Sequence, residues 1–302
     1  MIISASRRTD IPSYYSDWFF NRIKAGFVLV RNPMNYHQIS RIKINPEIVD
    51  GIVFWTKNPE PMIKRLAELN EYMFYFQFTL TSYGKDIEPH LPHKTKDILP
   101  IFKKVSNMIG PDRIIWRYDP ILINTKYTID YHTTAFSKIA KELSEYTKTV
   151  TISFIDTNYK GLKSNINKLN LTDFTDETQT KLASCLAPIA HEYGLFINTC
   201  AEKADLQPYG IERAQCIDAQ LFSKLLSSKI DIKKDRNQRL ECGCASSIDI
   251  GMYNSCMNGC LYCYANYNPQ TILSNHAKHN PLSPLLFGEA EIGDKITDRI
   301  TG

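Results

Sequence analysis

The strongest constraint on the fold of this chain is a repeated alternation between short apolar stretches and helix-like segments. Apolar stretches rich in β-branched or aromatic residues are typical of buried parallel strands, and the sequence has seven, at residues 1–7, 26–32, 51–57, 73–81, 113–120, 149–156 and 194–200. Segments that predict helices lie between several of them, at residues 16–25, 59–70, 133–147 and 175–194. Strands and helices in this alternation indicate an α/β fold with a mostly parallel sheet.

This many strand–helix units predict a TIM-type (β/α) barrel, complete or partial. A doubly wound open sheet is the main alternative, although no G-x-G-x-x-G motif follows the first strand and the sequence has no P-loop. We divide the chain of 302 residues into a barrel, residues 1–230, and a cysteine-rich segment with a tail, residues 231–302, that packs on it. Within these parts, residues 212–228 predict a further helix and the charged residues 231–241 predict a linker.

Polar residues follow the apolar stretches at the points where the predicted strands end. In a parallel barrel these ends face one mouth, where active sites are built, so seven polar groups should converge there. They are residues 6–10, 31–32, 56–58, 79–82, 117–119, 153–156 and 198–202. The pair Arg117 and Asp119 is flanked by apolar residues, so burial of its charges requires partners.

Bulk properties predict a cytoplasmic protein. The sequence has no apolar run of about 18 residues that could span a membrane, and its N-terminal residues lack the apolar region of a signal peptide. The net charge of +4 is compatible with a polyanionic partner without arguing for one.

The eight cysteines are unevenly distributed, and five lie between Glu241 and Tyr264. In a reducing compartment, clustered thiols are more often metal ligands or catalytic groups than disulfides. Cys256, Cys260 and Cys263 form the pattern C-x₃-C-x₂-C, and such spacing lets one loop wrap an inorganic centre. Three thiolates on a cubane iron–sulfur cluster leave one iron without a protein ligand, which is an open site for chemistry.

This pattern, with an aromatic residue before the last cysteine, resembles the signature of the radical S-adenosylmethionine (SAM) superfamily. The sequence "CLYCYA" at residues 260–265 is especially similar to the spore photoproduct lyase and DNA repair photolyase-like branch. The resemblance implies a [4Fe–4S] cluster on the three cysteines, SAM on the fourth iron, and reductive cleavage of SAM to a 5′-deoxyadenosyl radical. It also implies a complete or partial (β/α) barrel.

Other segments extend the resemblance over nearly the whole chain. "FWTKNPEPMIKRL" (54–66) and "RYDPIL" (117–122) are similar to segments of photolyase-like members. "SASRRTDIP" (4–12), "NTCAE" (198–202) and "CGCASSIDIGMYNSC" (242–256) resemble an uncharacterised bacterial family with the cysteine motif at the C-terminus.

The motif stands late in the chain, whereas the superfamily usually places it after the first barrel strand. The C-terminal segment should therefore fold back over the barrel mouth and present the cluster there. The sequence shows no glycine-rich SAM motif, so the candidates for cofactor binding rest on position alone. They are Thr56, Lys57, Arg117 and Ser153 at strand ends, and Tyr262 beside the cluster or an adenine ring.

Four further thiols, Cys200, Cys216, Cys242 and Cys244, could hold a second, fully ligated iron–sulfur cluster. The alternative for Cys200 and Cys216 is that they are small buried apolar residues. Zinc is the competing metal for the cysteine-rich segment, because Cys260 and Cys263 form one C-x₂-C pair of the kind that zinc sites use.

Together these features predict a radical SAM-type enzyme of unassigned substrate, with a [4Fe–4S] cluster and SAM as cofactors. Nucleic acid is one candidate substrate by resemblance, and flavodoxin or ferredoxin would be the electron donor. The alternative is a non-catalytic barrel protein whose cysteines form a structural zinc or iron–sulfur clasp.

Overall fold

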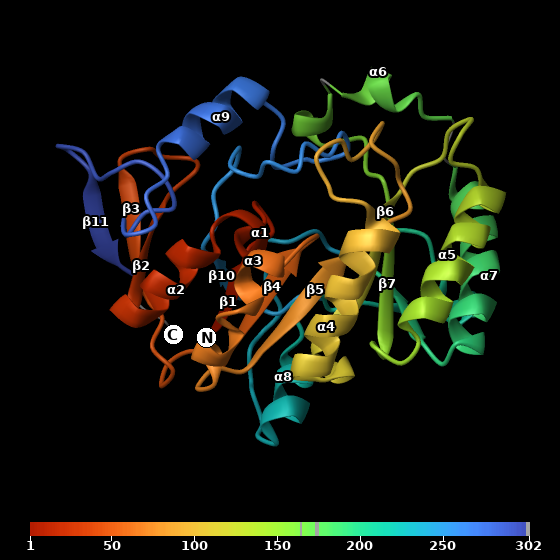
Figure 1. Cartoon of the computed structure of the whole chain (residues 1–302), viewed down its shortest axis with the longest axis horizontal. Coiled ribbons are helices and arrows are strands. Elements are labelled where there is room, and N and C mark those ends of the chain that lie inside the picture. The colour runs from red at the N-terminus through yellow and green to blue at the C-terminus, as the bar shows by residue number, and fades with distance from the viewer. Residues whose placement is uncertain (164, 173–174, 300–302) are drawn as a thin grey trace.

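A large parallel sheet forms the centre of the molecule (Figure 1). The computed structural model describes residues 1–163, 165–172 and 175–299. In these ranges the sheet has eight strands, and every neighbouring pair is parallel. Their spatial order is β10 (Ser247–Asp249), β1 (Ile2–Ala5), β4 (Gly51–Thr56), β5 (Phe74–Thr79), β6 (Ile114–Ile121), β7 (Thr149–Phe154), β8 (Phe196–Thr199) and β9 (Glu212–Arg213).

From β1 to β9 the strands of this sheet follow one another in chain order. The prediction of an α/β fold with a mostly parallel sheet is confirmed, and six of the seven predicted strands lie in it. β9 and β10 form the two edges, and in the described ranges no pairing between them closes the sheet. Both edge strands are very short and escaped the sequence analysis.

The predicted strand at residues 26–32 belongs instead to a separate three-stranded sheet. There β2 (Phe27–Arg31) pairs antiparallel with β3 (Gln38–Lys43), and β3 pairs parallel with β11 (Lys295–Asp298). The expectation of a parallel barrel strand here was wrong because a parallel crossover needs a dozen or more residues. The connection from Arg31 to Gln38 is a tight hairpin, in which the Asn32 amide donates to the Gln38 carbonyl at 2.8 Å.

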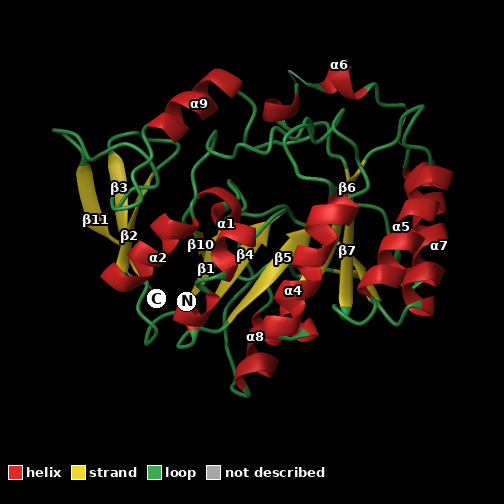
Figure 2. Cartoon of the chain, in the orientation of Figure 1, coloured by secondary structure: helices red, strands yellow, loops and turns green. Residues whose placement is uncertain are grey.

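Most of the longer helices cover one face of the large sheet, whereas α8 (Ala219–Leu226) packs on the other (Figure 2). The two longest, α5 (Ile129–Leu143) and α7 (Asp176–Glu192), begin at side-chain caps: the Thr128 side chain accepts from the Tyr131 amide, and that of Thr175 accepts from the Thr178 amide. The other helices are α1 (Ile11–Tyr14), α2 (Ser16–Ala25), α3 (Glu60–Ile63), α4 (Leu99–Ile109), α6 (Ile166–Leu169) and α9 (Pro269–Ala277).

The helix predicted over residues 212–228 is shorter than expected. Its first residues form β9, and α8 begins only after Asp218, whose side chain accepts from the Gln220 and Leu221 amides. None of the helices in the described ranges combines the length and apolar character that a membrane crossing needs.

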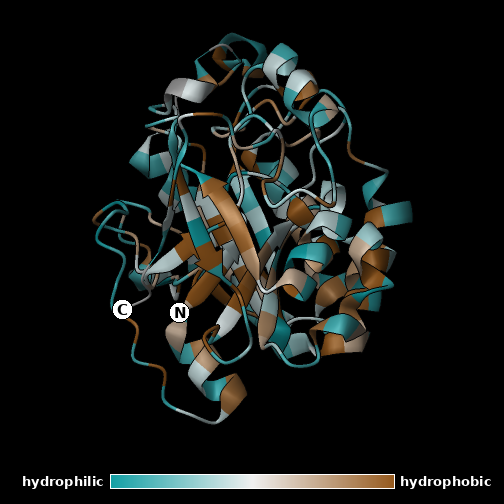
Figure 3. Ribbon diagram, turned by 90° about the vertical axis from the view of Figure 1, so that its left-hand side faces the viewer, coloured by the Kyte–Doolittle hydropathy of each residue, from teal (hydrophilic) through white to brown (hydrophobic). Residues whose placement is uncertain are grey.

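The two faces of the sheet bury different sets of residues. On β5, Phe74, Phe76 and Phe78 join the main core beneath the helices, whereas Tyr75 faces the other way. Figure 3 shows this apolar interior in brown, with polar helix surfaces outside it. The second face is covered by residues from the chain between β9 and β10, among them Phe222 of α8 and three cysteines, Cys216, Cys242 and Cys244.

Candidate functional site

Residues 255–266, which we name the cysteine loop, are bound to the segment that follows β1. The Tyr15 hydroxyl donates to the Ser255 carbonyl at 2.5 Å. The side-chain amide of Asn266 donates from Nδ2 to the Arg8 carbonyl at 2.8 Å, and the Tyr264 hydroxyl donates to the Arg7 carbonyl at 3.0 Å. Arg7 and Arg8 come directly after the carboxyl end of β1, and Figure 1 shows the blue C-terminal chain crossing above the strand tips. The cysteine loop therefore lies at the carboxyl end of the sheet.

β10 reinforces this placement by pairing with β1. Its last residue, Asp249, accepts hydrogen bonds from Ser4 Oγ at 2.9 Å, Ser6 Oγ at 2.5 Å and the Arg7 amide at 2.8 Å. One carboxylate thus binds the end of β1 to the chain that leads into the cysteine loop. Sequence reasoning missed Asp249, because its role depends on a pairing between the two ends of the chain.

We name the three thiols of the cysteine loop the triad; they are Cys256, Cys260 and Cys263. Cys256 and Cys260 are buried, and Cys263 is partly exposed. Burial raises the pKa of Cys260 to about 12, while the nearby Lys57 charge opposes this shift. Burial also raises the pKa of Cys256, and the neighbouring Asp10 carboxylate and then the thiols of Cys260 and Cys263 add to this shift. The triad is therefore a close group of largely buried thiols beside a cation.

The bend between the first two triad cysteines has defined supports. Gly259 has a φ of +68°, a conformation that suits glycine. Its neighbour Asn258 accepts from the Tyr14 hydroxyl at 2.8 Å and donates to Asp10 Oδ2 at 3.3 Å. On the other side, the His90 ring bonds to the Met257 carbonyl at 2.7 Å.

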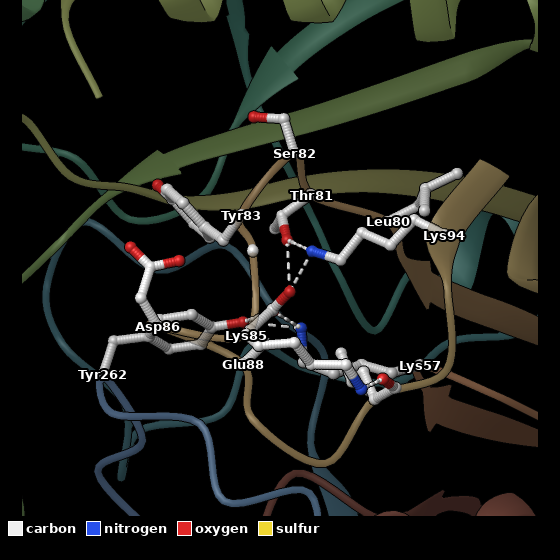
Figure 4. Close-up of polar contacts among 12 residues, drawn as sticks. Lys57, Leu80, Thr81, Ser82, Tyr83, Lys85, Asp86, Glu88, Lys94 and Tyr262 are labelled. Carbon is white, nitrogen blue, oxygen red and sulfur yellow. Dashed lines mark hydrogen bonds and ion pairs between the residues drawn. The ribbon is translucent and has the colours of Figure 1, made fainter. Parts of the chain in front are cut away.

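A buried charged network lies next to the triad, centred on Glu88 (Figure 4). Glu88 is 1% exposed. It accepts from Lys57 Nζ at 2.8 Å and from Thr81 Oγ1 at 2.8 Å, and it also binds Lys94 and the Tyr262 hydroxyl. Burial alone would raise the pKa of Glu88, but the Lys57 and Lys94 ammonium groups lower it to about 2. Glu88 is therefore a carboxylate shared by two cations and a tyrosine.

Lys57 connects this network with the cysteine loop. Its Nζ donates to the Tyr262 hydroxyl at 2.6 Å, and its backbone amide donates to Asp10 Oδ2 at 2.8 Å. Burial would lower the pKa of Lys57, but Glu88 and Cys260 raise it. Lys57 is thus a largely buried cation directly after β4, in contact with Tyr262, the residue that precedes Cys263.

A second polar group lies on β6 and β7. Arg117 is 4% exposed, and its Nε donates to Asp119 Oδ2 at 2.9 Å. Ser153 binds the other oxygen of Asp119. The buried arginine therefore has the partner that its apolar surroundings require. Nearby, Glu202 accepts from the Phe154 amide at 2.9 Å, and burial raises the pKa of Glu202 to about 7.

Four further thiols, which we name the tetrad, converge beside Arg117. Cys216 Sγ donates to Cys200 Sγ at 3.2 Å, and Arg117 Nη1 lies 3.0 Å from Cys216 Sγ. Cys244 lies close enough to Cys216 and Cys242 to interact with both thiols electrostatically. The eighth cysteine, Cys185, lies on α7 in the helical layer. In the part of the chain that the structure describes, no three His, Cys, Asp or Glu side chains are arranged to hold a single metal ion.

Four of the five residues predicted to bind a cofactor form two pairs in the structure. Lys57 contacts Tyr262 directly. Arg117 and Ser153 both bind Asp119, which connects them. Thr56 is buried, and its hydroxyl accepts from the Asn58 amide at 3.1 Å and bonds to Asp10, so it supports the loop after β4. The sequence did not identify Glu88 and Lys94 as residues of the site. They lie in and beside an irregular loop, where no periodicity distinguishes a buried charge from an exposed one.

The fold and these contacts define a parallel α/β protein with a thiol-rich loop at the carboxyl end of its sheet. Residues 2–265 match a family described as "Domain of unknown function (DUF1848)", and the chain belongs to that family. No curated protein matches the chain. Among solved structures, one from Bacteroides thetaiotaomicron VPI-5482 described as "a putative alpha-L-fucosidase" is 11% identical, with a TM-score of 0.26, over 70% of this chain and 80% of that one. A likeness this weak carries no argument.

Proposed function

We propose that the chain is a radical SAM-type enzyme whose triad, Cys256, Cys260 and Cys263, holds a [4Fe–4S] cluster. The observation that carries the proposal is the position of the triad at the carboxyl end of a parallel sheet, beside the buried network of Lys57, Glu88 and Tyr262. Carboxyl ends of parallel strands are where α/β proteins place ligands. The monotonic strand order also supports the finer proposal that the sheet is a partial (β/α) barrel.

The residues of the triad fit such a cluster. Thiolates are its usual protein ligands, and short cysteine spacings let one loop supply several of them. Because each thiolate of a cluster binds a different iron, the thiols need not converge on one point as the ligands of a single ion must. When bound, a three-cysteine cluster would supply an electron for the reductive cleavage of SAM at its open iron.

The neighbouring side chains provide binding groups for an anionic cofactor. An ammonium group has three N–H donors, and Lys57 uses two of them on Glu88 and Tyr262. The third can bind a carboxylate group such as that of SAM. Arg117, Asp119 and Ser153, on adjacent strands, offer a second polar group for the rest of the cofactor or the substrate.

Partners follow from the chemistry proposed. A one-electron donor is required, and flavodoxin or ferredoxin has the appropriate chemistry. The substrate class is unassigned, with nucleic acid as a candidate only through the photolyase-like resemblance. The competing function is a structural zinc or iron–sulfur clasp on a non-catalytic protein, which would hold metal without turning over SAM.

The test is production of 5′-deoxyadenosine. Protein purified without oxygen is reduced with dithionite in the presence of SAM, and the product is measured by chromatography with mass detection. We expect 5′-deoxyadenosine from the wild type and from Cys185→Ser, the matched control on α7, but at least a hundredfold less from Cys260→Ser. Zinc without sulfide at the triad, or equal product from Cys260→Ser, would contradict the proposal.

A further inference from the structure

We infer that the tetrad, Cys200, Cys216, Cys242 and Cys244, is a second metal centre, in which four thiolates bind a zinc ion or an iron–sulfur cluster. These cysteines come from three separate parts of the chain: the end of β8, the connection between β9 and α8, and the C-x-C segment before β10. The proposal does not depend on radical SAM activity at the triad.

Contacts among the four thiols are specific. Cys200 and Cys216 Sγ atoms lie 3.2 Å apart, and Cys244 lies close enough to Cys216 and Cys242 to interact with both electrostatically. Cys216 and Cys244 are each 2% exposed. A cysteine that serves only as a small apolar residue packs against aliphatic or aromatic groups. These thiols also lie in the apolar cluster on the second face of the sheet, but the sulfur–sulfur contact between Cys200 and Cys216 and the guanidinium group beside Cys216 are not explained by apolar packing.

Backbone amides and a guanidinium group also lie near these sulfur atoms. The backbone amides of Cys244 and Ile217 lie near the thiols of Cys242 and Cys244, respectively. Arg117 Nη1 lies 3.0 Å from Cys216 Sγ. Donors aimed at sulfur stabilise the thiolate form and are the supporting contacts typical of thiolate-bound metals.

The surroundings are suited to a centre with net negative charge. Four thiolates carry more negative charge than a Zn²⁺ ion or a [4Fe–4S]²⁺ core neutralises, so nearby cations lower the cost of burying it. Two guanidinium groups lie near the site: Arg117 contacts Cys216, and Arg7 interacts electrostatically with Cys244 and Cys216. Both guanidinium groups also lie over the Trp55 ring, at 5.2 Å and 5.8 Å from its centre.

A metal would require the sulfur atoms of the tetrad to move, since in the described residues no three such side chains are arranged to hold an ion. Tetrahedral zinc with Zn–S bonds of about 2.3 Å places its sulfur atoms about 3.8 Å apart. The contact between Cys200 and Cys216 is shorter, at 3.2 Å, so these sulfur atoms must separate on binding. A cluster requires a larger separation because each thiolate binds its own iron. Either occupant uses all four thiolates, so the centre is closed, unlike the triad.

The experiment counts metal in protein reconstituted anaerobically with iron and sulfide, and separately with zinc. Wild type, a triad variant (Cys256→Ser, Cys260→Ser and Cys263→Ser), a tetrad variant (Cys216→Ser and Cys244→Ser) and the control Cys185→Ser are compared. Far-UV circular dichroism reports whether each is folded. The wild type should bind about eight irons, or about four irons and one zinc, since each [4Fe–4S] cluster holds four.

The decisive sample is the triad variant. We expect it to retain about four irons with sulfide, which identifies a cluster, or about one zinc, which identifies a zinc site. A folded triad variant that binds neither would overturn the inference, as would a wild type with about four irons and no zinc that loses all iron in this variant. The metal content of the wild type and of the triad variant therefore decides whether the tetrad is a metal centre, even if the tetrad variant fails to fold. If the wild type and the triad variant both bind about four irons or both bind about one zinc, the tetrad centre stands and the proposed function fails.

Discussion

Lys57 and Glu88 form a buried ion pair, with Nζ 2.8 Å from Oε1, that joins the end of β4 to the loop after β5. Both residues also contact the Tyr262 hydroxyl, so the pair is part of the attachment of the cysteine loop to the sheet. A charge network of this kind is costly to bury and is held in place by its mutual contacts. We therefore expect that disrupting this charge network displaces the triad, and that displacing the triad disturbs the network.

Replacing Glu88 by glutamine should destabilise the protein strongly. The change leaves Lys57 and Lys94 buried without their shared carboxylate, and loss of one partner of a buried ion pair costs about 3 to 5 kcal/mol. Urea unfolding at neutral pH measures the loss. The matched control is Glu68→Gln, in a more exposed pair with Arg65, which should cost less than about 1 kcal/mol. Equal losses for both variants would show that Glu88 has no special structural role.

Tyr262→Phe should distinguish a role of the Tyr262 hydroxyl in the reaction from a role in the stability of the protein. It removes only the hydroxyl that binds Lys57 and Glu88. Loss of one such hydrogen bond should cost about 1 to 2 kcal/mol of stability. We expect iron content at the triad to persist and 5′-deoxyadenosine production to fall at least tenfold. The control Tyr253→Phe, on a partly exposed ring stacked by Arg8, should leave both unchanged. Full production by Tyr262→Phe would exclude a role for this hydroxyl in the reaction.

Gly259→Ala tests whether the bend of the cysteine loop is required for metal binding. Gly259 and Gly194 have the same φ of +68°, so alanine should be strained equally at both. Only at Gly259 would the new methyl group meet neighbours, with His90 Nδ1 at 2.9 Å and Pro89 Cγ at 3.2 Å, whereas Gly194 has nothing within 4 Å.

Both variants should therefore lose a similar amount of stability from strain, roughly 1 kcal/mol. Iron bound at the triad, measured per chain after reconstitution, should fall severalfold in Gly259→Ala and stay constant in Gly194→Ala. A Gly259→Ala protein with full iron content would mean that the bend tolerates displacement of His90.

His132 should make stability depend on pH. Its Nδ1 faces the Tyr118 hydroxyl at 2.8 Å and its Nε2 faces the Leu122 carbonyl at 2.9 Å, so Nε2 carries the proton and Nδ1 accepts. Burial lowers the pKa of His132 from 6.5 to about 4. Between these values the unfolded chain binds a proton that the folded protein does not, so stability falls as the pH decreases through this range.

The wild type should thus lose roughly 2 to 3 kcal/mol more than His132→Gln between about pH 7 and about pH 4.5. Denaturant unfolding at both pH values measures this difference. Other groups, including Glu202 with its raised pKa, are common to both proteins and cancel in the comparison. An identical pH dependence would show that His132 titrates normally in the folded protein.

Much of the fold could be predicted from the sequence because its strands are apolar on both faces. On β5, for example, aromatic residues alternate between the main core and the second core, which gives a continuous apolar stretch. The stretch at residues 26–32 has the same composition, but its pairing partner is set by the short connection to Gln38. Composition identifies a strand, whereas connection length decides which sheet it joins.

The site was only partly predictable. Position at a strand end identified Lys57, and its place within the cysteine motif identified Tyr262, which contacts Lys57. Glu88 gave no signal, since a glutamate in a loop is normally solvated. The tetrad brings together cysteines from segments that are far apart in the sequence: Cys216 lies beside both Cys200 and Cys244. The spacing of the cysteines in the sequence does not reveal these contacts.

The binding of Asp249 to Ser4, Ser6 and the Arg7 amide has a consequence for how the protein is made. Ser4 and Asp249 are 245 positions apart in the sequence, so β1 must wait for β10 until all the strands between them have been synthesised. The triad can therefore reach its place only after that, and a metal bound by the assembled triad must arrive when most of the sheet already exists.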